Sequence, residues 1–122
     1  IMSSTSRIIR LTFLGGALGT AARFTLSLTL GDVPSIIFVN LLGAALLGWF
    51  NGNTKNDTDD FNTFWKVGFT GGFTTMSAFA SFSVLYMQVL GLWAVLATVA
   101  ISALGLGAYA LAFNIAKKKA RA

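Results

Sequence analysis

The fold is decided by the stretch TGGFTT, residues 70–75, which lies near the middle of the apolar segment 64–90. Two adjacent glycines weaken a helix. A helix that breaks at membrane depth frees carbonyl and N–H groups, which must find partners in protein, water or an ion. Interrupted helices near the bilayer midplane are a recurrent ion-site device. We therefore predict a third helix broken near its middle, close to Gly71 and Gly72. The alternative is close helix–helix packing through small residues.

The composition of the chain predicts an integral membrane protein. Of its 122 residues, 55% are hydrophobic and 11% are charged, whereas a soluble domain carries about 25% charged residues. No charge occurs in 33–53 or in 67–116, and Arg23 is the only one between residues 11 and 30. About 20 apolar residues cross a bilayer as a helix. We expect an all-α integral membrane fold in a single domain, 1–122, with four transmembrane helices at approximately 7–30, 34–51, 63–90 and 92–116.

The positive charges indicate how the chain is oriented. With four spans, both termini and the loop 51–62 lie on one side of the membrane, and tight turns near Asp32 and Gly91 lie on the other. The turns carry no Lys or Arg, whereas the first side carries Arg7, Arg10, Lys55, Lys66, Lys117, Lys118, Lys119 and Arg121. Since cytoplasmic loops are enriched in Lys and Arg, we predict a multi-pass protein of the cell membrane with both termini cytoplasmic. We interpret the net charge of +5 as attraction of the basic segments to the anionic lipids of the bilayer. We expect no nucleic acid partner.

The chain lacks the residues that most enzyme sites need. It has no His, Cys or Glu, and its carboxylates are Asp32, Asp57, Asp59 and Asp60, all in predicted loops. No general base, thiolate nucleophile or histidine-containing metal site can be built from these residues. We interpret the acidic cluster as a solvated loop, with a hard-cation site as the alternative. We predict that the protein is not an enzyme and assign it no catalytic or cofactor-binding residue.

Two polar side chains inside the first two predicted spans are candidates for an ion path. Arg23 and Asn40 stand at a depth where polar and charged groups are costly and tend to be functional. The structural alternatives are snorkelling of Arg23 to the interface and an interhelical hydrogen bond from Asn40.

Further candidates lie beyond the break and in the last span. Met76 and Phe79 share one helical face, and the electropositive edge of a phenyl ring can face an anion, although apolar packing is the simpler interpretation. Thr98 and Ser102 are four residues apart, so they lie on one face of the last span, and Tyr109 lies a further two turns on. Their hydroxyls either bond back to the helix or form a polar track.

Taken together, these residues resemble the Fluc/CrcB fluoride-channel family over essentially the whole chain. The resemblance rests on GTAARF at 19–24, VNLLG at 39–43 and above all TGGFTT at 70–75. It implies a fluoride-selective passive channel subunit that lowers cytoplasmic fluoride by export across the plasma membrane of a prokaryote, and so gives fluoride resistance. It also implies a dual-pore antiparallel dimer.

The resemblance further implies roles for individual residues. Backbone carbonyls of Gly71 and Thr74 would hold a structural sodium ion at the centre of the dimer. Arg23 would lie near a vestibule. The fluoride pore would be lined by Asn40, Thr75, Met76, Ser77, Phe79 and Ser102.

Two positions depart from the family pattern and bear on the partner. Met76 stands where the family has a second pore phenylalanine, and Phe82 where it often has glutamate; methionine lacks the ring's positive edge. An antiparallel homodimer needs one sequence to insert both ways, yet the positive charges here favour one side. We therefore predict a partner paralogue of opposite orientation, with a homodimer as the alternative.

Two other functions remain as alternatives. One is a non-conducting or partly conducting partner subunit of a heterodimeric fluoride channel. The more remote one is a small multidrug-type exporter, a class that couples to protons through a membrane-embedded carboxylate, which the predicted spans lack.

Overall fold

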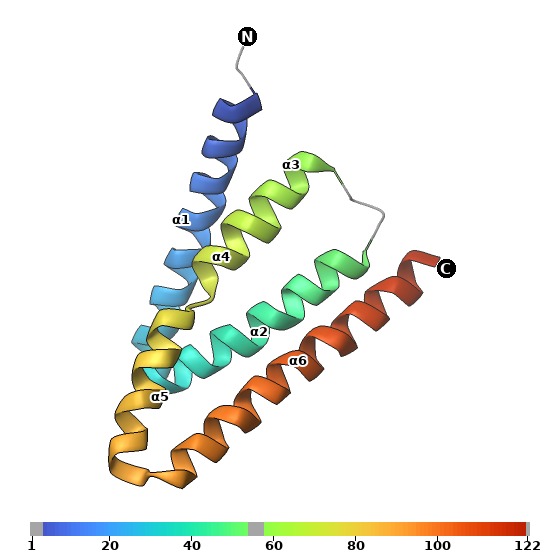
Figure 1. Cartoon of the computed structure of the whole chain (residues 1–122). Coiled ribbons are helices and arrows are strands. Elements are labelled where there is room, and N and C mark those ends of the chain that lie inside the picture. The colour runs from blue at the N-terminus through green and yellow to red at the C-terminus, as the bar shows by residue number, and fades with distance from the viewer. Residues whose placement is uncertain (1–3, 54–57, 122) are drawn as a thin grey trace.

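The computed structural model describes residues 4–53 and 58–121, and within these ranges the structure is helical, with no strand (Figure 1). The predicted all-α fold is therefore confirmed. Lys55 and Asp57 lie outside the described residues. The elements in chain order are α1 (Ser4–Leu30), α2 (Asp32–Gly52), α3 (Asp59–Phe61), η2 (Asn62–Phe69), α4 (Thr70–Phe73), α5 (Met76–Leu90) and α6 (Leu92–Arg121).

Within the described residues, three of the predicted spans have helices long and apolar enough to cross a membrane. They are Asp32–Gly52, Asp59–Leu90 and Leu92–Arg121. The helix α1 has 27 residues, which is about 40 Å and ample for a bilayer. It is not among the three, because Arg7, Arg10, Arg23 and many Ser and Thr side chains make it more polar. The structure thus supports a membrane protein with three such helices, and a fourth span at α1 stays a prediction.

Glycines make the two tight turns at one end of the molecule. Gly31 and Gly91 are the residues with positive φ, 89° and 62°, in the described chain, a conformation that favours glycine. Gly31 lets α2 follow α1 directly, and Gly91 joins α5 to α6. The start of α1, the end of α2 and the end of α6 lie at the opposite end (Figure 1).

The third predicted span is interrupted, but not at the glycine pair. Gly71 and Gly72 are helical, and the helix ends at Phe73, so that Thr74 and Thr75 take extended backbone angles before α5 begins. A Cβ at Gly72 would overlap the Gly16 carbonyl oxygen of α1. The expected break near the middle is therefore present. The close-packing interpretation applies to Gly72, and the location of the break is corrected to Thr74–Thr75.

The helices pack as two pairs. The first is α2 along α6, and the second is α1 along η2 and α4. Small residues let the backbones approach, as is common between membrane helices. Added Cβ atoms at Gly48 and Gly52 would overlap the carbonyl oxygens of Tyr109 and Phe113, and one at Gly19 would overlap that of Phe69. The two seams fix the positions of α2, α4 and α6 around the break.

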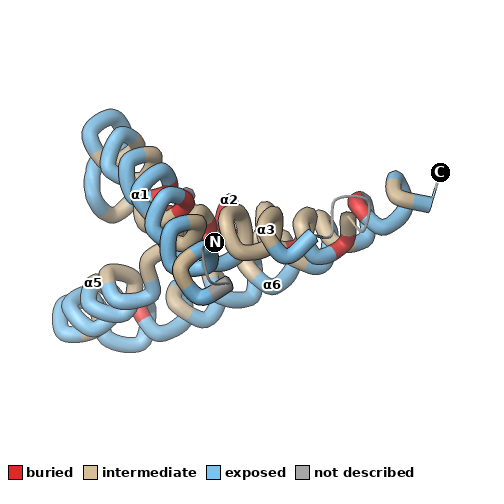
Figure 2. The backbone as a smooth tube through the Cα atoms, turned by 90° about the horizontal axis from the view of Figure 1, so that it is seen from above, coloured by how far each residue is buried: buried red, intermediate tan, exposed pale blue. Residues whose placement is uncertain are grey.

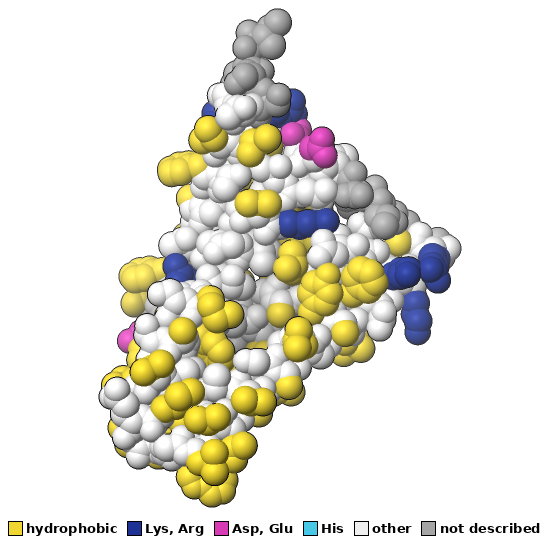
Figure 3. All heavy atoms as spheres, viewed as in Figure 1, with side chains coloured by type: hydrophobic (Ala, Val, Ile, Leu, Met, Phe, Trp, Pro, Cys, Tyr) yellow, Lys and Arg dark blue, Asp and Glu magenta, His cyan; other side chains and the backbone are white. Residues whose placement is uncertain are grey.

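The helix α5 has the least cover of the long helices. None of its residues is buried, and Figure 2 shows it in pale blue and tan beside the better packed pairs. The side chains of Met76 and Val89 are 73% and 75% exposed. Hydrophobic side chains are also spread over the visible face in Figure 3. An apolar surface of this extent marks contact with lipid or with another protein subunit.

Candidate functional site

Asn40 from α2 holds the interruption of the third span open. Its side-chain Nδ2 donates to the carbonyl of Thr75 at 3.0 Å, and its Oδ1 accepts from the Thr75 N–H at 2.8 Å. One amide side chain thus satisfies both backbone groups of a single residue. The Thr75 hydroxyl in turn accepts from the Ala78 N–H at 3.2 Å and caps α5, as threonine does at helix N-termini.

These bonds leave two carbonyls without their regular helical donors. In a continuous α-helix the N–H of residue i+4 donates to the carbonyl of residue i. The Thr75 N–H is given to Asn40, so the Gly71 carbonyl lacks that donor. The Ala78 N–H is given to the Thr75 hydroxyl, so the Thr74 carbonyl lacks it too. These are the two carbonyls that the resemblance nominates as cation ligands. Both lose their regular donors to side-chain acceptors, Asn40 Oδ1 and the Thr75 hydroxyl.

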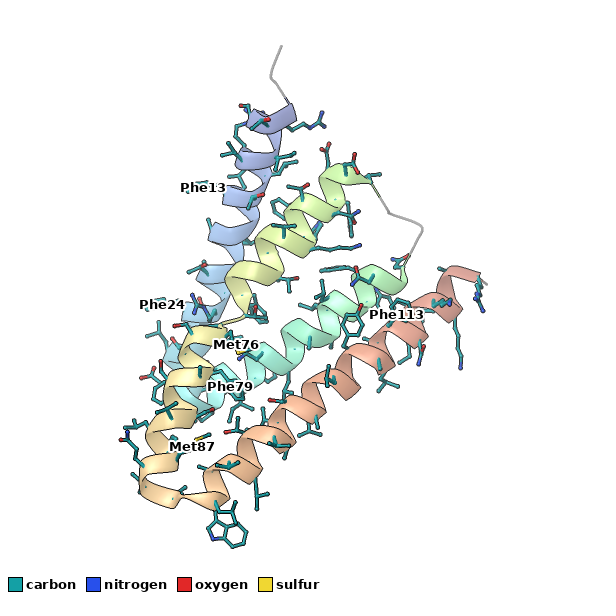
Figure 4. All side chains as sticks on the ribbon, viewed as in Figure 1. Phe13, Phe24, Met76, Phe79, Met87 and Phe113 are labelled. Carbon is teal, nitrogen blue, oxygen red and sulfur yellow. The ribbon has the colours of Figure 1, made fainter. Side chains whose placement is uncertain are left out.

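A groove of about 510 Å³ runs from the break between α2, α5 and α6. We call it the central groove. Figure 4 shows Met76 and Phe79 on the side of α5 that faces α2. Its walls are mostly apolar, with a few polar groups among them. The structure brings together here Asn40, Met76, Phe79 and Ser102 of the predicted pore residues, and adds Thr70, Thr74 and Tyr109.

A second pocket, of about 380 Å³, lies on the other side of the break between α1, α2 and α5. It contains Arg23, Thr75 and Phe82, together with Ser27 and Asp32. Arg23 is half-buried there. The pocket lies beside the break, so Arg23 and Thr75 lie together and apart from the central groove.

Two predicted site residues line neither cavity. Ser77 is exposed on the first turn of α5, and Gly71 is exposed with no atom within 4 Å of where a Cβ would lie. The Gly71 carbonyl and not a side chain is the group of interest, so its exposed position leaves it open to a ligand or a second subunit.

The hydroxyls of the last span bond back to their own helix. Thr98 donates to the Ala94 carbonyl and Ser102 to the Thr98 carbonyl, both at 2.9 Å. Of the two alternatives for these residues, back-bonding is the one found. Thr74 likewise donates to the Thr70 carbonyl at 2.9 Å.

The sequence analysis noted Tyr109 beyond Ser102 but did not assign it to the pore, and it did not single out Asn51. Tyr109 lines the central groove, and its hydroxyl accepts from Asn51 Nδ2 at 2.8 Å. Tyr109 is seven residues after Ser102, two turns along the same face of α6. That spacing is the sequence signal that could have placed Tyr109 in the groove. Asn51 stands at the expected end of the second span, and no sequence pattern there indicates a role in the site.

Asp59 and Asp60 are the acidic residues of the connection that the structure describes. No group of three His, Cys, Asp or Glu side chains occurs in 4–53 and 58–121. Asp60 pairs with Arg7, and Asp59 and Asp60 stand in the first turn of α3, where carboxylates interact favourably with the helix dipole. This fits the solvated interpretation of Asp59 and Asp60.

Comparison with known proteins shows that residues 10–115 of the chain match the family model described as CrcB-like protein, Camphor Resistance (CrcB). Fluoride-specific ion channel FluC 1 of Corynebacterium glutamicum is 46% identical over 65 residues, covering 52% of this chain and 58% of that protein. FluC 2 of Leifsonia xyli subsp. xyli is 44% identical over 84 residues, covering 61% and 58%. FluC of Salmonella arizonae is 37% identical over 89 residues, covering 62% and 66%. The chain thus spans 58% of the length of the first two relatives. All three names describe ion channels and none an enzyme, in agreement with the prediction that the chain is not one.

Proposed function

This chain belongs to the CrcB-like protein family, and from that premise we propose that it is a subunit of a passive fluoride-specific ion channel. The observation that carries the proposal is the central groove beside the interrupted helix, in a chain whose relatives are named fluoride-specific ion channels. Export through it would lower cytoplasmic fluoride and give fluoride resistance. The described residues of the groove include no carboxylate, so it offers no side chain for coupling to protons.

The groove residues suit a small anion that must pass without being held tightly. Asn40 uses one N–H of its amide on Thr75, and an amide nitrogen carries two donors. Phe79 contributes a ring whose edge is electropositive. Met76 is polarizable but has no such edge. Weak and few contacts are what conduction needs, because an ion must leave as readily as it enters.

We propose that the carbonyls of Gly71 and Thr74 hold a structural sodium ion. Both have lost their helical donors to side chains, and a hard cation takes oxygen ligands of this kind. Two carbonyls from one chain do not complete a coordination shell. The same pair from a second, antiparallel subunit would supply more oxygens at the centre of a two-subunit, dual-pore assembly.

The uncovered surface of α5 supports such an assembly, because a subunit packed against it would bury its exposed apolar side chains.

We propose that both termini are cytoplasmic and that α1 is the fourth span. Lys117, Lys118, Lys119 and Arg121 all stand at the end of α6, and dark blue side chains gather there in Figure 3. This one-sided charge favours a paralogue of opposite orientation as the partner over a second copy.

Fluoride efflux from liposomes tests the function and the partner together. We expect no efflux with this chain alone and rapid efflux when a paralogue from the same genome, with the opposite Lys and Arg bias, is reconstituted beside it. Rapid efflux from this chain alone would rule out the need for a paralogue. Absence of efflux from every combination would contradict the channel itself.

A non-conducting partner subunit is the second candidate, and Met76 and Phe82 are the residues that favour it. We expect Phe79→Leu to lower efflux of the two-subunit channel about tenfold, since the ring lines the central groove and such a loss is about 1.4 kcal/mol of barrier. A matched control is Phe13→Leu, a ring on the outer side of α1 (Figure 4). Unchanged efflux in Phe79→Leu would favour the silent subunit.

A further inference from the structure

Beside the amide of Asn40, the possible donors of the central groove are hydroxyl groups, and their hydrogen bonds show which of them have a hydrogen to give. A hydroxyl has one hydrogen to donate. Thr70 donates its hydrogen to the Trp65 carbonyl at 2.8 Å, Thr74 to the Thr70 carbonyl at 2.9 Å, and Ser102 to the Thr98 carbonyl at 2.9 Å. All three are therefore committed to the backbone. An anion in the groove meets only their lone pairs.

Tyr109 differs from these three residues. Its hydroxyl oxygen accepts from Asn51 Nδ2 at 2.8 Å, and among the described residues no acceptor is recorded for its own hydrogen. A hydroxyl that accepts a hydrogen bond becomes a better donor, because bonds in a chain polarise one another. The phenol of Tyr109 is thus the one groove hydroxyl in the described residues with a hydrogen to give.

Tyr109 is held in place at its ring and at its backbone. It stacks on Phe113 with ring centroids 6.2 Å apart and planes 15° apart. The backbone of Tyr109 lies so close to Gly48 of α2 that a Cβ at Gly48 would overlap its carbonyl oxygen. A donor fixed in this way needs little reorganisation to meet a ligand.

We propose that Tyr109 is an anion-binding residue of the central groove, which donates its phenol hydrogen to fluoride at the end of the groove nearest the C-terminus of α6. This inference rests on the proposed function. Tyr109 lies about 10 Å along the helix from Ser102, so it forms a step separate from Asn40 and Phe79. Asn51 is a positioning residue, since it occupies the oxygen of the phenol and leaves the hydrogen directed elsewhere. A single strong donor favours a small, hard anion over chloride.

The test is Tyr109→Phe, which removes the hydroxyl and keeps the ring, in the full chain with the partner that gives efflux. We expect fluoride efflux to fall about tenfold and the half-saturating fluoride concentration to rise, because a hydrogen bond to a charged group is lost. We also expect fluoride to raise the thermal unfolding midpoint of the unmodified protein but not of the variant. The matched control is Tyr86→Phe, the other tyrosine, which stands on α5 and does not line the central groove.

The results separate the inference from the function on which it rests. Normal efflux and normal half-saturation in Tyr109→Phe would overturn the inference while leaving the channel in place. A fluoride-dependent stabilisation that Tyr109→Phe abolishes, in a protein without efflux, would support the binding site and contradict the channel. If fluoride neither stabilises nor crosses the unmodified protein, both fail.

The role of Asn51 is tested by a double-mutant cycle. Asn51→Leu leaves the phenol in place, so we expect it to lower efflux less than Tyr109→Phe. In the double variant, the change at Asn51 is expected to add nothing to the loss from Tyr109→Phe, because it acts through that hydroxyl. Additive losses would show that Asn51 acts independently and would overturn its positioning role.

Discussion

Replacing Asn40 by leucine is expected to abolish fluoride efflux and to lower the thermal unfolding midpoint. The amide of Asn40 bonds the N–H and the carbonyl of Thr75 at 2.8 and 3.0 Å. Leucine has nearly the same size but satisfies neither group. The Thr75 carbonyl keeps a longer bond from the Phe79 N–H at 3.4 Å, so the main loss is that of the Thr75 N–H, and a group left unpaired costs about 1–3 kcal/mol. No other single side chain in the described structure supports both polar groups of a break residue.

The loss of Asn40 would also change the shape of the site. Without that amide, the regular partner for the Thr75 N–H is the Gly71 carbonyl, which would extend α4 through the break. The two carbonyls proposed to hold sodium would then be consumed within the helix. Efflux is therefore lost even in a variant that stays folded.

The matched control for Asn40 is Asn114→Leu, the same change at an exposed position of α6. We expect Asn114→Leu to keep the efflux and the unfolding midpoint of the unmodified protein. Efflux and melting temperature are measured on the same reconstituted samples. Wild-type values for both in Asn40→Leu would refute the proposal that this amide holds the break open.

Much of the fold is predictable from the sequence because membrane helices are coded by local hydropathy. The turns after α1 and α5 are made by Gly31 and Gly91, which have positive φ. The break itself was expected inside residues 70–75. Its location at Thr74–Thr75 was not, since it depends on Asn40, which lies 35 residues earlier in the chain. A long-range side-chain bond of this kind leaves no local pattern.

Other features of the site escaped prediction for similar reasons. The π-helix η2 brings the Thr70 hydroxyl to the Trp65 carbonyl, five residues back, where a regular helix would bring it to residue 66. Hydropathy does not distinguish these two forms. The sequence left both a polar track and back-bonding open for Ser102, and the structure shows that its hydrogen is given to the Thr98 carbonyl of the same helix. Either hydrogen bond is compatible with the same residue spacing, so the spacing does not decide between them.

The second large effect is expected at the seam between α1 and α4. Gly19→Ala should destabilise the protein by about 1–3 kcal/mol, the usual cost of overpacking, with the upper part of that range favoured. The added Cβ would overlap the Phe69 carbonyl oxygen and lie 2.8 Å from the Phe73 N–H nitrogen. Both atoms belong to the backbone, so neither can turn aside as a flexible side chain would. The helices must move apart instead.

Separation of this seam should also reach the site, because α4 ends at the break and the Thr20 hydroxyl bonds the Gly72 carbonyl at 3.4 Å. We therefore expect Gly19→Ala to lose efflux together with stability. The control is Gly16→Ala in the same helix, where the new Cβ would meet the Gly68 carbonyl oxygen at an ordinary 3.7 Å. Alanine there should be neutral or stabilise the helix by up to about 1 kcal/mol. Thermal unfolding of both variants decides the matter: equal melting temperatures for Gly19→Ala and Gly16→Ala would mean that α1 does not depend on close approach at Gly19.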